Sequence, residues 1–177
     1  EQYHRAGLQI HTHTNGDEAS ETAINAVERI LARAPRADHR HTLQHAQMID
    51  APLFRRMAQL GLCVNLFANH LWYWGDQHYE MTMGPDRANR LDACASALAA
   101  GVPMAIHSDA PVTPLGPLFT AWCAVNRVTP KGRVLVGCRR RAPDLVIEVW
   151  DTGLGIPVSK QKDVFREFER LAPAAKT

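Results

Sequence analysis

Long apolar runs are absent from this chain of 177 residues. No stretch approaches the roughly 18 to 20 apolar residues with which a helix crosses a bilayer, so the sequence predicts no membrane partner. The chain also lacks the charged start and following apolar run of a secretory signal peptide. We therefore expect a cytoplasmic protein, or a fragment of one.

Cysteine is scarce as well. The four cysteines are widely spaced, and no two of them form the Cys-x-x-Cys pair of zinc knuckles and thiol redox sites. This spacing is typical of reduced, mostly buried thiols and argues against a disulfide framework. The four residues are Cys63, Cys94, Cys123 and Cys138.

Lysine and histidine are each missing from one part of the chain. Residues 1–129 contain 10 arginines, 12 acidic residues and no lysine, a net charge of −2, whereas residues 130–177 contain 10 basic and 6 acidic residues, a net charge of +4. All nine histidines lie at or before His107. This change predicts two domains, 1–129 and 130–177. The basic residues of the second alternate with apolar ones, as on a solvated strand face, so we expect no nucleic-acid partner.

Short apolar runs alternate with helical patterns through the first domain. Residues 16–34 carry apolar side chains at helical spacing, with Asp17 as a possible N-cap. Residues 50–61 repeat the pattern, with Asp50 before a proline-containing first turn and Gly61 after the last. Strand, loop and helix recur four times, which is typical of a parallel α/β fold. The predicted strands lie within residues 6–13, 41–47, 62–70 and 102–111.

Histidine and aspartate follow three of these predicted strands. His13 closes the first, His45 the second, and Asp109 follows the fourth. In a parallel α/β barrel the corresponding strand ends meet on one face, where active sites form. Two imidazoles and a carboxylate suit a zinc-type ion and leave a position open for water. Bound water then has a pKa near 7 and attacks carbonyls, with Asp109 placed to accept its proton.

Each of these three residues also has a purely structural interpretation. A single histidine at a strand end is more often a hydrogen-bonded structural residue than a metal ligand. Asp109 precedes Ala-Pro and can cap a turn. Because all three occur at the same point of their strand units, the sequence favours a metal site with His13, His45 and Asp109 as ligands.

Five motifs occur in a fixed order in residues 1–129. They are HTNGDEA (13–19), QHAQMI (44–49), NHLWYWGDQH (69–78), the segment 84–118 that contains HSDAPVTPLGPL, and AWCAVNRVT (121–129). Together they resemble the C-terminal half of the metal-dependent amidohydrolases of family 3, in the branch that includes N-substituted formamide deformylase.

This resemblance implies a TIM barrel and assigns roles within it. His13 and His45 would be the ligands of the fifth and sixth strands, and Asp109 the ligand of the eighth strand and the catalytic base. His11 is a weaker alternative to His13 as a ligand. The loop after the seventh strand would bring a catalytic His70 near the substrate. Its companions there would be Trp72, Trp74, Asp76 and His78.

Half of such a barrel is missing. A complete one takes about 250 residues, and the first four strands with their ligands have no counterpart here. No lysine in residues 1–129 can serve as a carboxylated bridge between two metals. We expect a partial TIM-barrel-like (β/α)4 half, followed by a small β-hairpin and a helix. Its open sheet edges predict a homodimer.

The second domain resembles a different family. Residues 131–171 read as two strands joined near Pro143, a glycine-rich loop and a helix. DTGLGI (151–156) and VFREFERL (164–171) resemble two boxes of the ATP-binding domain of sensor histidine kinases. The resemblance implies that Asp151 holds adenine and that Gly153 and Gly155 let the backbone approach the nucleotide. The magnesium-binding helix and the later phosphate loop are missing, so we expect no complete ATP site.

The two resemblances meet at VTPKGRVL (128–135), which fits both families. This overlap predicts a chimera joined near residues 128–136, by natural crossover or by an assembly junction. The alternative is one domain whose tail approaches the kinase pattern by chance.

Three hypotheses for function remain. The first is a hydrolase of amides, formamides, lactones or esters that uses zinc or another divalent metal and acts on a small molecule. The others are a nucleotide-binding fragment and a half-barrel without enzymatic activity.

Overall fold

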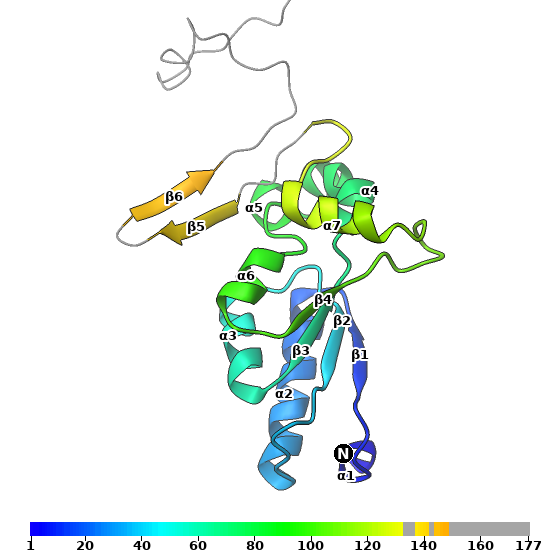
Figure 1. Ribbon diagram of the computed structural model, residues 1–177, viewed down its shortest axis with the longest axis vertical. Coiled ribbons are helices and arrows are strands. Elements are labelled where there is room, and N and C mark those ends of the chain that lie inside the picture. The colour runs from blue at the N-terminus through cyan, green and yellow to red at the C-terminus, as the bar shows by residue number, and fades with distance from the viewer. Residues whose placement is uncertain (133–136, 142–143, 149–177) are drawn as a thin grey trace, which may run out of the picture.

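Four short parallel strands form the centre of the protein. The computed structural model describes residues 1–132, 137–141 and 144–148 (Figure 1). The sheet has the order β1-β2-β3-β4, with every neighbouring pair parallel. This confirms the predicted α/β class and is the order of four successive strands in a barrel. The strands are β1 (His11–Thr14), β2 (Thr42–His45), β3 (Cys63–Leu66) and β4 (Met104–Ile106).

Three helices pack against the sheet and close the core. Helix α2 (Asp17–Arg33) contacts β1 and α3 (Ala51–Leu60), which contacts α6 (Cys94–Ala99). Parallel neighbours need such crossover helices because the chain must return to the start of the next strand. The core between helices and strands is aliphatic, and its fully buried members include Ile24, Leu43, Phe54, Met57, Val64 and Leu66.

The predicted ends of α3 are confirmed. The Asp50 side chain accepts a hydrogen bond from the Leu53 backbone N–H (3.0 Å), and Gly61 ends the helix in the left-handed region with φ of 70°. The predicted N-cap of α2 is wrong by one position. The helix begins at Asp17, and Gly16 occupies the cap with extended backbone. Asp17 therefore lies in the first turn, where its carboxylate favourably meets the positive end of the helix.

The connection between β3 and β4 is long and helical. It contains α4 (His70–Gln77), the π-helical turn η1 (His78–Thr82), α5 (Pro85–Ala88) and α6. Helix α7 (Pro117–Asn126) follows β4, and the short α1 (Gln2–Arg5) precedes β1. Figure 1 shows α4 and α7 beyond the C-terminal ends of the strands and α1 at the opposite end.

A separate antiparallel hairpin follows the half-barrel. Strand β5 (Gly137–Arg141) pairs with β6 (Asp144–Glu148), which confirms the predicted hairpin. The glycine-rich loop and helix predicted after it, with Asp151, Gly153 and Gly155, lie outside the described residues. Within the described ranges, no helix is both long and apolar enough to cross a membrane.

A chain of buried histidines stabilises the N-terminal end of the sheet. His39 Nδ1 accepts a hydrogen bond from the His41 backbone N–H (2.9 Å), and its Nε2 donates to the Leu60 carbonyl (2.7 Å). His41 Nδ1 accepts from the Ile10 backbone N–H (3.1 Å). Each neutral ring must therefore carry its proton on Nε2.

His41 extends this chain to α1. Its Nε2 faces His4 Nδ1 at 2.8 Å, and His4 Nε2 faces the Ala34 carbonyl at 2.8 Å. With the proton on Nε2 of both rings, every contact has one donor and one acceptor. All three histidines are almost fully buried. Their hydrogen bonds tie α1 to the sheet only while His41 is neutral, because its Nδ1 must accept the Ile10 N–H.

Acid should weaken this arrangement. Burial, reinforced by the neighbouring His39 and His4, lowers the pKa of His41 to about 4. In the unfolded chain His41 has an ordinary pKa near 6.5. Between about pH 6.5 and 4 the unfolded state therefore binds a proton that the folded state does not bind. We expect the free energy of unfolding to fall by roughly 3 kcal/mol as the pH drops from about 6.5 to about 4.

Urea unfolding followed by circular dichroism at several pH values measures this effect. His41→Gln is the control, since it removes the titrating ring and should have a flatter pH dependence. Equal slopes for the two proteins would contradict the role given to His41.

Candidate active site

The polar residues of the site lie at one edge of the sheet because the strands end level. The register pairs Thr14 with His45, His45 with Leu66, and Leu66 with Ile106. Side chains at the C-terminal ends therefore converge on a cavity of about 340 Å³. Its lining residues are His13, Asn15, His45, Gln47, Phe67, His70, Trp74, His78, Asp109 and Val112.

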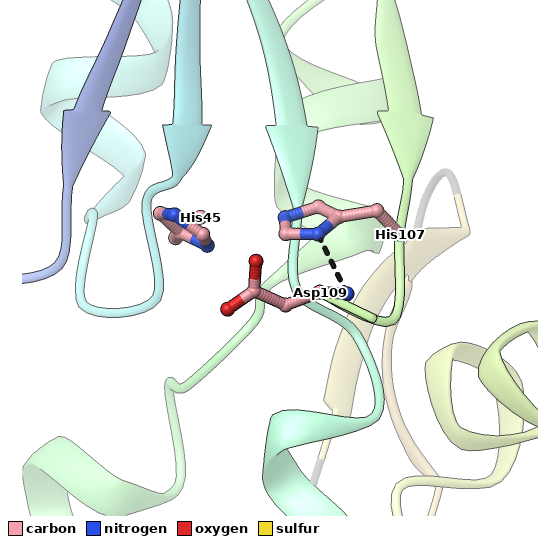
Figure 2. Close-up of side chains that lie close together, drawn as sticks. All are labelled: His45, His107 and Asp109. Carbon is pink, nitrogen blue, oxygen red and sulfur yellow. Dashed lines mark hydrogen bonds between the residues drawn. The ribbon is translucent and has the colours of Figure 1, made fainter. Parts of the chain in front are cut away.

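Three potential metal ligands lie close together at the C-terminal ends of the strands. One donor atom each from His45, His107 and Asp109 lies within 4.8 Å of the other two. Figure 2 shows the Asp109 carboxylate directed toward the gap between the two imidazole rings. Two nitrogens and one oxygen at this separation fit a zinc-type ion, with a further position open to solvent or substrate.

The backbone is strained at this cluster. His45, Ala46 and Asp109 all have positive φ, between 49° and 68°, a region that non-glycine residues rarely adopt. Hydrogen bonds hold the strained segment, since the Ala46 N–H donates to the Thr14 carbonyl at 2.7 Å. Strain of this kind commonly accompanies functional sites because the surrounding fold must maintain it.

Burial keeps His45 ready to bind a cation. It lowers the pKa of the imidazole, and the negative charge of Asp109 opposes this only in part. A neutral imidazole has a free lone pair, which is the form that ligates metals.

His107 has a fixed tautomer in this structure. Its Nδ1 accepts a hydrogen bond from the Asp109 backbone N–H (3.1 Å), so the neutral ring carries its proton on Nε2. That Nε2 is buried and has no hydrogen-bond partner among the described residues. Burial also lowers the pKa of His107, which favours the neutral ring. The sequence did not indicate His107, because this residue and Asp109 follow the end of β4 and meet only through the turn in which Asp109 has positive φ.

The two predicted histidines of β1 differ in position. His13 lines the cavity, with its ring centroid 4.4 Å from that of His45, but it lies outside the three-residue cluster. His11, the weaker alternative, is exposed and contacts the side-chain amide of Gln44.

The segment after β3 contributes a second group of rings to the cavity. His70 and Trp74 of α4 and His78 of η1 line it, and their roles toward a substrate stay predictions. Trp72 instead packs edge-on against Trp122 of α7. Asp76 accepts a hydrogen bond from the Thr129 hydroxyl at 2.8 Å and also lies outside the cavity lining.

Phe67 connects the two groups of histidines. Its ring stacks on His107 with centroids 5.3 Å apart and lies 5.4 Å from His70 and 6.0 Å from His45. Since Phe67 is 97% buried, it limits how far these imidazoles can move.

Comparison with known proteins gives one family. Residues 1–148 match the model of the Amidohydrolase family. The matched region therefore continues past residue 129 through the hairpin. The division into two domains and the resemblance of the tail to histidine kinases stay predictions.

Two curated proteins have similar sequences. Protein LONG AFTER FAR-RED 3 of Arabidopsis thaliana is 29% identical over 128 residues, which is 72% of this chain and 22% of the relative. The putative amidohydrolase YtcJ of Bacillus subtilis strain 168 is 30% identical over 124 residues, covering 68% of this chain and 22% of the relative. The chain thus spans only about a fifth of the length of these relatives.

Two solved structures share the fold. An uncharacterized metal-dependent hydrolase from Pyrococcus horikoshii OT3 superposes with a TM-score of 0.56 at 18% identity, covering 70% of this chain and 24% of the other. An uncharacterized metal-dependent hydrolase from Pyrococcus furiosus superposes with a TM-score of 0.53 at 19% identity, covering 71% of this chain and 25% of the other. At this identity the likeness shows the fold alone, in which four neighbouring parallel strands are part of an α/β barrel.

The central position of Phe67 predicts a large effect of its removal. Phe67→Ala should lower the free energy of unfolding by about 3 to 5 kcal/mol, because it leaves a cavity among the rings. Leu118→Ala is the control, since Leu118 is 87% exposed and its loss should cost less than about 0.5 kcal/mol. Urea unfolding measures both. Equal losses would contradict the role of Phe67.

Proposed function

Because the chain belongs to the amidohydrolase family, we propose that it supplies the C-terminal half of a metal-dependent hydrolase that attacks carbonyl substrates. The observation that carries the proposal is the meeting of His45 and Asp109, both of which line the cavity, with His13 against His45 and His107 within ligand distance of both. Since the chain covers about a fifth of its curated relatives, a full active site would include residues from outside it.

We assign the metal to His45, Asp109 and His13. His45 is neutral and buried, and Asp109 brings the negative charge that a divalent ion needs. His107 is less suitable as the third ligand because its Nε2 carries a proton while Nδ1 accepts the Asp109 N–H. His13, which lies against His45 and is exposed, is free to turn toward the same point.

The ion, zinc or another divalent metal, would polarise a carbonyl and lower the pKa of water to about 7. Asp109 would accept the proton that the attacking water releases. His107 would hold the loop that presents this carboxylate, because its Nδ1 accepts the Asp109 backbone N–H. Phe67 keeps that ring in place.

The cavity favours a small substrate with one apolar side. About 340 Å³ suits a small organic molecule, and Phe67, Trp74 and Val112 give it an apolar wall. Amides, formamides, lactones and esters all present the required carbonyl. The resemblance to N-substituted formamide deformylase favours an N-substituted formamide. An activated ester or lactone needs less activation and would be turned over first by an incomplete site.

Metal content tests the ligand set. The protein purified from zinc-supplemented medium should carry about one ion per chain. His45→Ala and Asp109→Ala should each lose it, and His13→Ala should lose most of it. His107→Gln should retain it. Inductively coupled plasma mass spectrometry after exhaustive dialysis gives the metal per chain.

His11→Ala is the matched control, since His11 lies on the same strand as His13 but outside the cavity. It should bind metal like the unaltered chain. Absence of metal from the unaltered chain, or its retention without His45 and Asp109, would contradict the proposed function. Loss in His107→Gln but not in His13→Ala would reassign the third ligand.

A further inference from the structure

Asp92 is a buried carboxyl group that the proposed metal site does not use. It is 1% exposed and lies between α5 and α6, and neither of its carboxyl oxygens has a hydrogen-bond partner among the described residues. Leaving such a group unpaired costs several kcal/mol, so its position requires an explanation. Burial raises the pKa of Asp92, and His70 opposes this shift.

His70 is the polar side chain that faces Asp92. Its Nδ1 lies 3.5 Å from Asp92 Oδ2, and this Nδ1 is also buried without a hydrogen-bond partner. The two unsatisfied atoms thus face each other at slightly more than hydrogen-bond distance. A proton on His70 Nδ1 satisfies both, whereas a lone pair there would point at a carboxylate and be repelled.

The rest of the contacts of His70 agree with this proton position. His70 Nε2 lies 3.4 Å from His78 Nε2, and His78 Nδ1 lies 2.6 Å from the Thr82 hydroxyl. With Nδ1 protonated on His70, the donors run in one direction, from Thr82 through His78 and His70 to Asp92. The contact between the two imidazoles is long and therefore weak, so a substrate in the cavity can replace it.

Packing fixes the plane of the His70 ring but not its proton. The ring stacks between Trp74 and His78, with centroids 5.0 Å away on each side, and Phe67 touches it at 5.4 Å. These contacts are the same for either tautomer. The two nitrogens are distinguished by their polar neighbours, Asp92 at Nδ1 and the weakly held His78 at Nε2.

Arg127 offers a competing role for Asp92. It is a half-buried cation whose attraction also favours the charged carboxylate. Its guanidinium, however, donates to main-chain carbonyls, at 3.0 Å to Asp92 and 2.6 Å to Leu91. The Asp92 side chain has no hydrogen bond to it and faces His70. Arg127 therefore holds the backbone turn that presents the carboxylate.

We propose that Asp92 is a positioning residue, which holds the proton of His70 on Nδ1 and so directs the Nε2 lone pair into the cavity. His70 can then take a proton from a substrate or water and return it to a leaving group, as a carboxylate-oriented histidine does in hydrolases. The catalytic part of this inference rests on the proposed function. The proton position does not, because it concerns the protein alone.

The tautomer of His70 is measured directly by ¹⁵N NMR. Long-range ¹H–¹⁵N spectra of histidine-labelled protein at pH 8 distinguish a protonated ring nitrogen from one with a lone pair. His70→Gln identifies the signals. We expect Nδ1–H for His70 in the unaltered chain and Nε2–H as the major form in Asp92→Leu, which removes the acceptor that faces Nδ1. Asp86→Leu, the same change at a nearby exposed site, should leave Nδ1–H in place.

An unaltered chain with Nε2–H on His70 would overturn the proposal, and this result does not depend on whether Asp92→Leu folds. A folded Asp92→Leu that keeps Nδ1–H would overturn it as well, because a merely structural Asp92 changes stability and leaves the tautomer unchanged. A tautomer change in Asp86→Leu would also count against it.

Activity adds a separate test. If a carbonyl substrate is hydrolysed, Asp92→Leu should lower kcat by about 10² to 10⁴ and leave KM and metal content nearly unchanged. A lost metal would indicate failure of the metal site, whereas an unchanged kcat would overturn the role of Asp92.

Discussion

The level, parallel pairing of four strands is the constraint on which the site depends. In this arrangement the C-terminal ends of β2 and β4 lie at one edge, although the segments that follow them are about 60 residues apart in the chain. A register shift of one residue would turn His45 to the other face of the sheet. Aliphatic side chains such as Leu43 and Val64 on the strands, packed against α2, α3 and α6, fix that register. The chemistry thus depends on the core behind it.

Histidine has two different roles at the two ends of this sheet. At the N-terminal end, every ring nitrogen of His4, His39 and His41 has a partner, so these rings are available neither to metal nor to substrate. At the C-terminal end, Nε2 of His107 and Nδ1 of His70 are buried and have no hydrogen bond of ordinary geometry within the part of the chain that the structure describes, although Asp92 faces His70 Nδ1 at 3.5 Å. This difference agrees with the general division of parallel barrels into a stabilising face and an active face.

The sequence predicted the fold better than the site. Alternating strand and helix patterns, the Asp50 cap and Gly61 were sufficient for the four βα units, because local signals set these features. The prediction of Asp17 as the N-cap of α2 was wrong by one position. Glycine is also a favoured N-cap residue, and Gly16 takes that position with extended backbone. The homodimer, the cytoplasmic location and the kinase-like tail stay predictions.

The site was only partly predictable because its residues meet through tertiary contacts. The sequence indicated His13, His45 and Asp109 through their positions at strand ends, and the family resemblance indicated His70. It did not indicate His107, whose role depends on a hydrogen bond to the Asp109 backbone. Asp92 lies in a helical connection with no motif of its own, and only its burial against His70 makes it notable.

Anomalous X-ray diffraction from crystals of the cobalt-loaded protein locates a bound metal directly. We expect one strong anomalous peak at the C-terminal edge of the sheet, within bonding distance of His45 and Asp109. A peak elsewhere on the molecule, or no peak at saturating cobalt, would contradict the claim that this half-barrel holds a metal site.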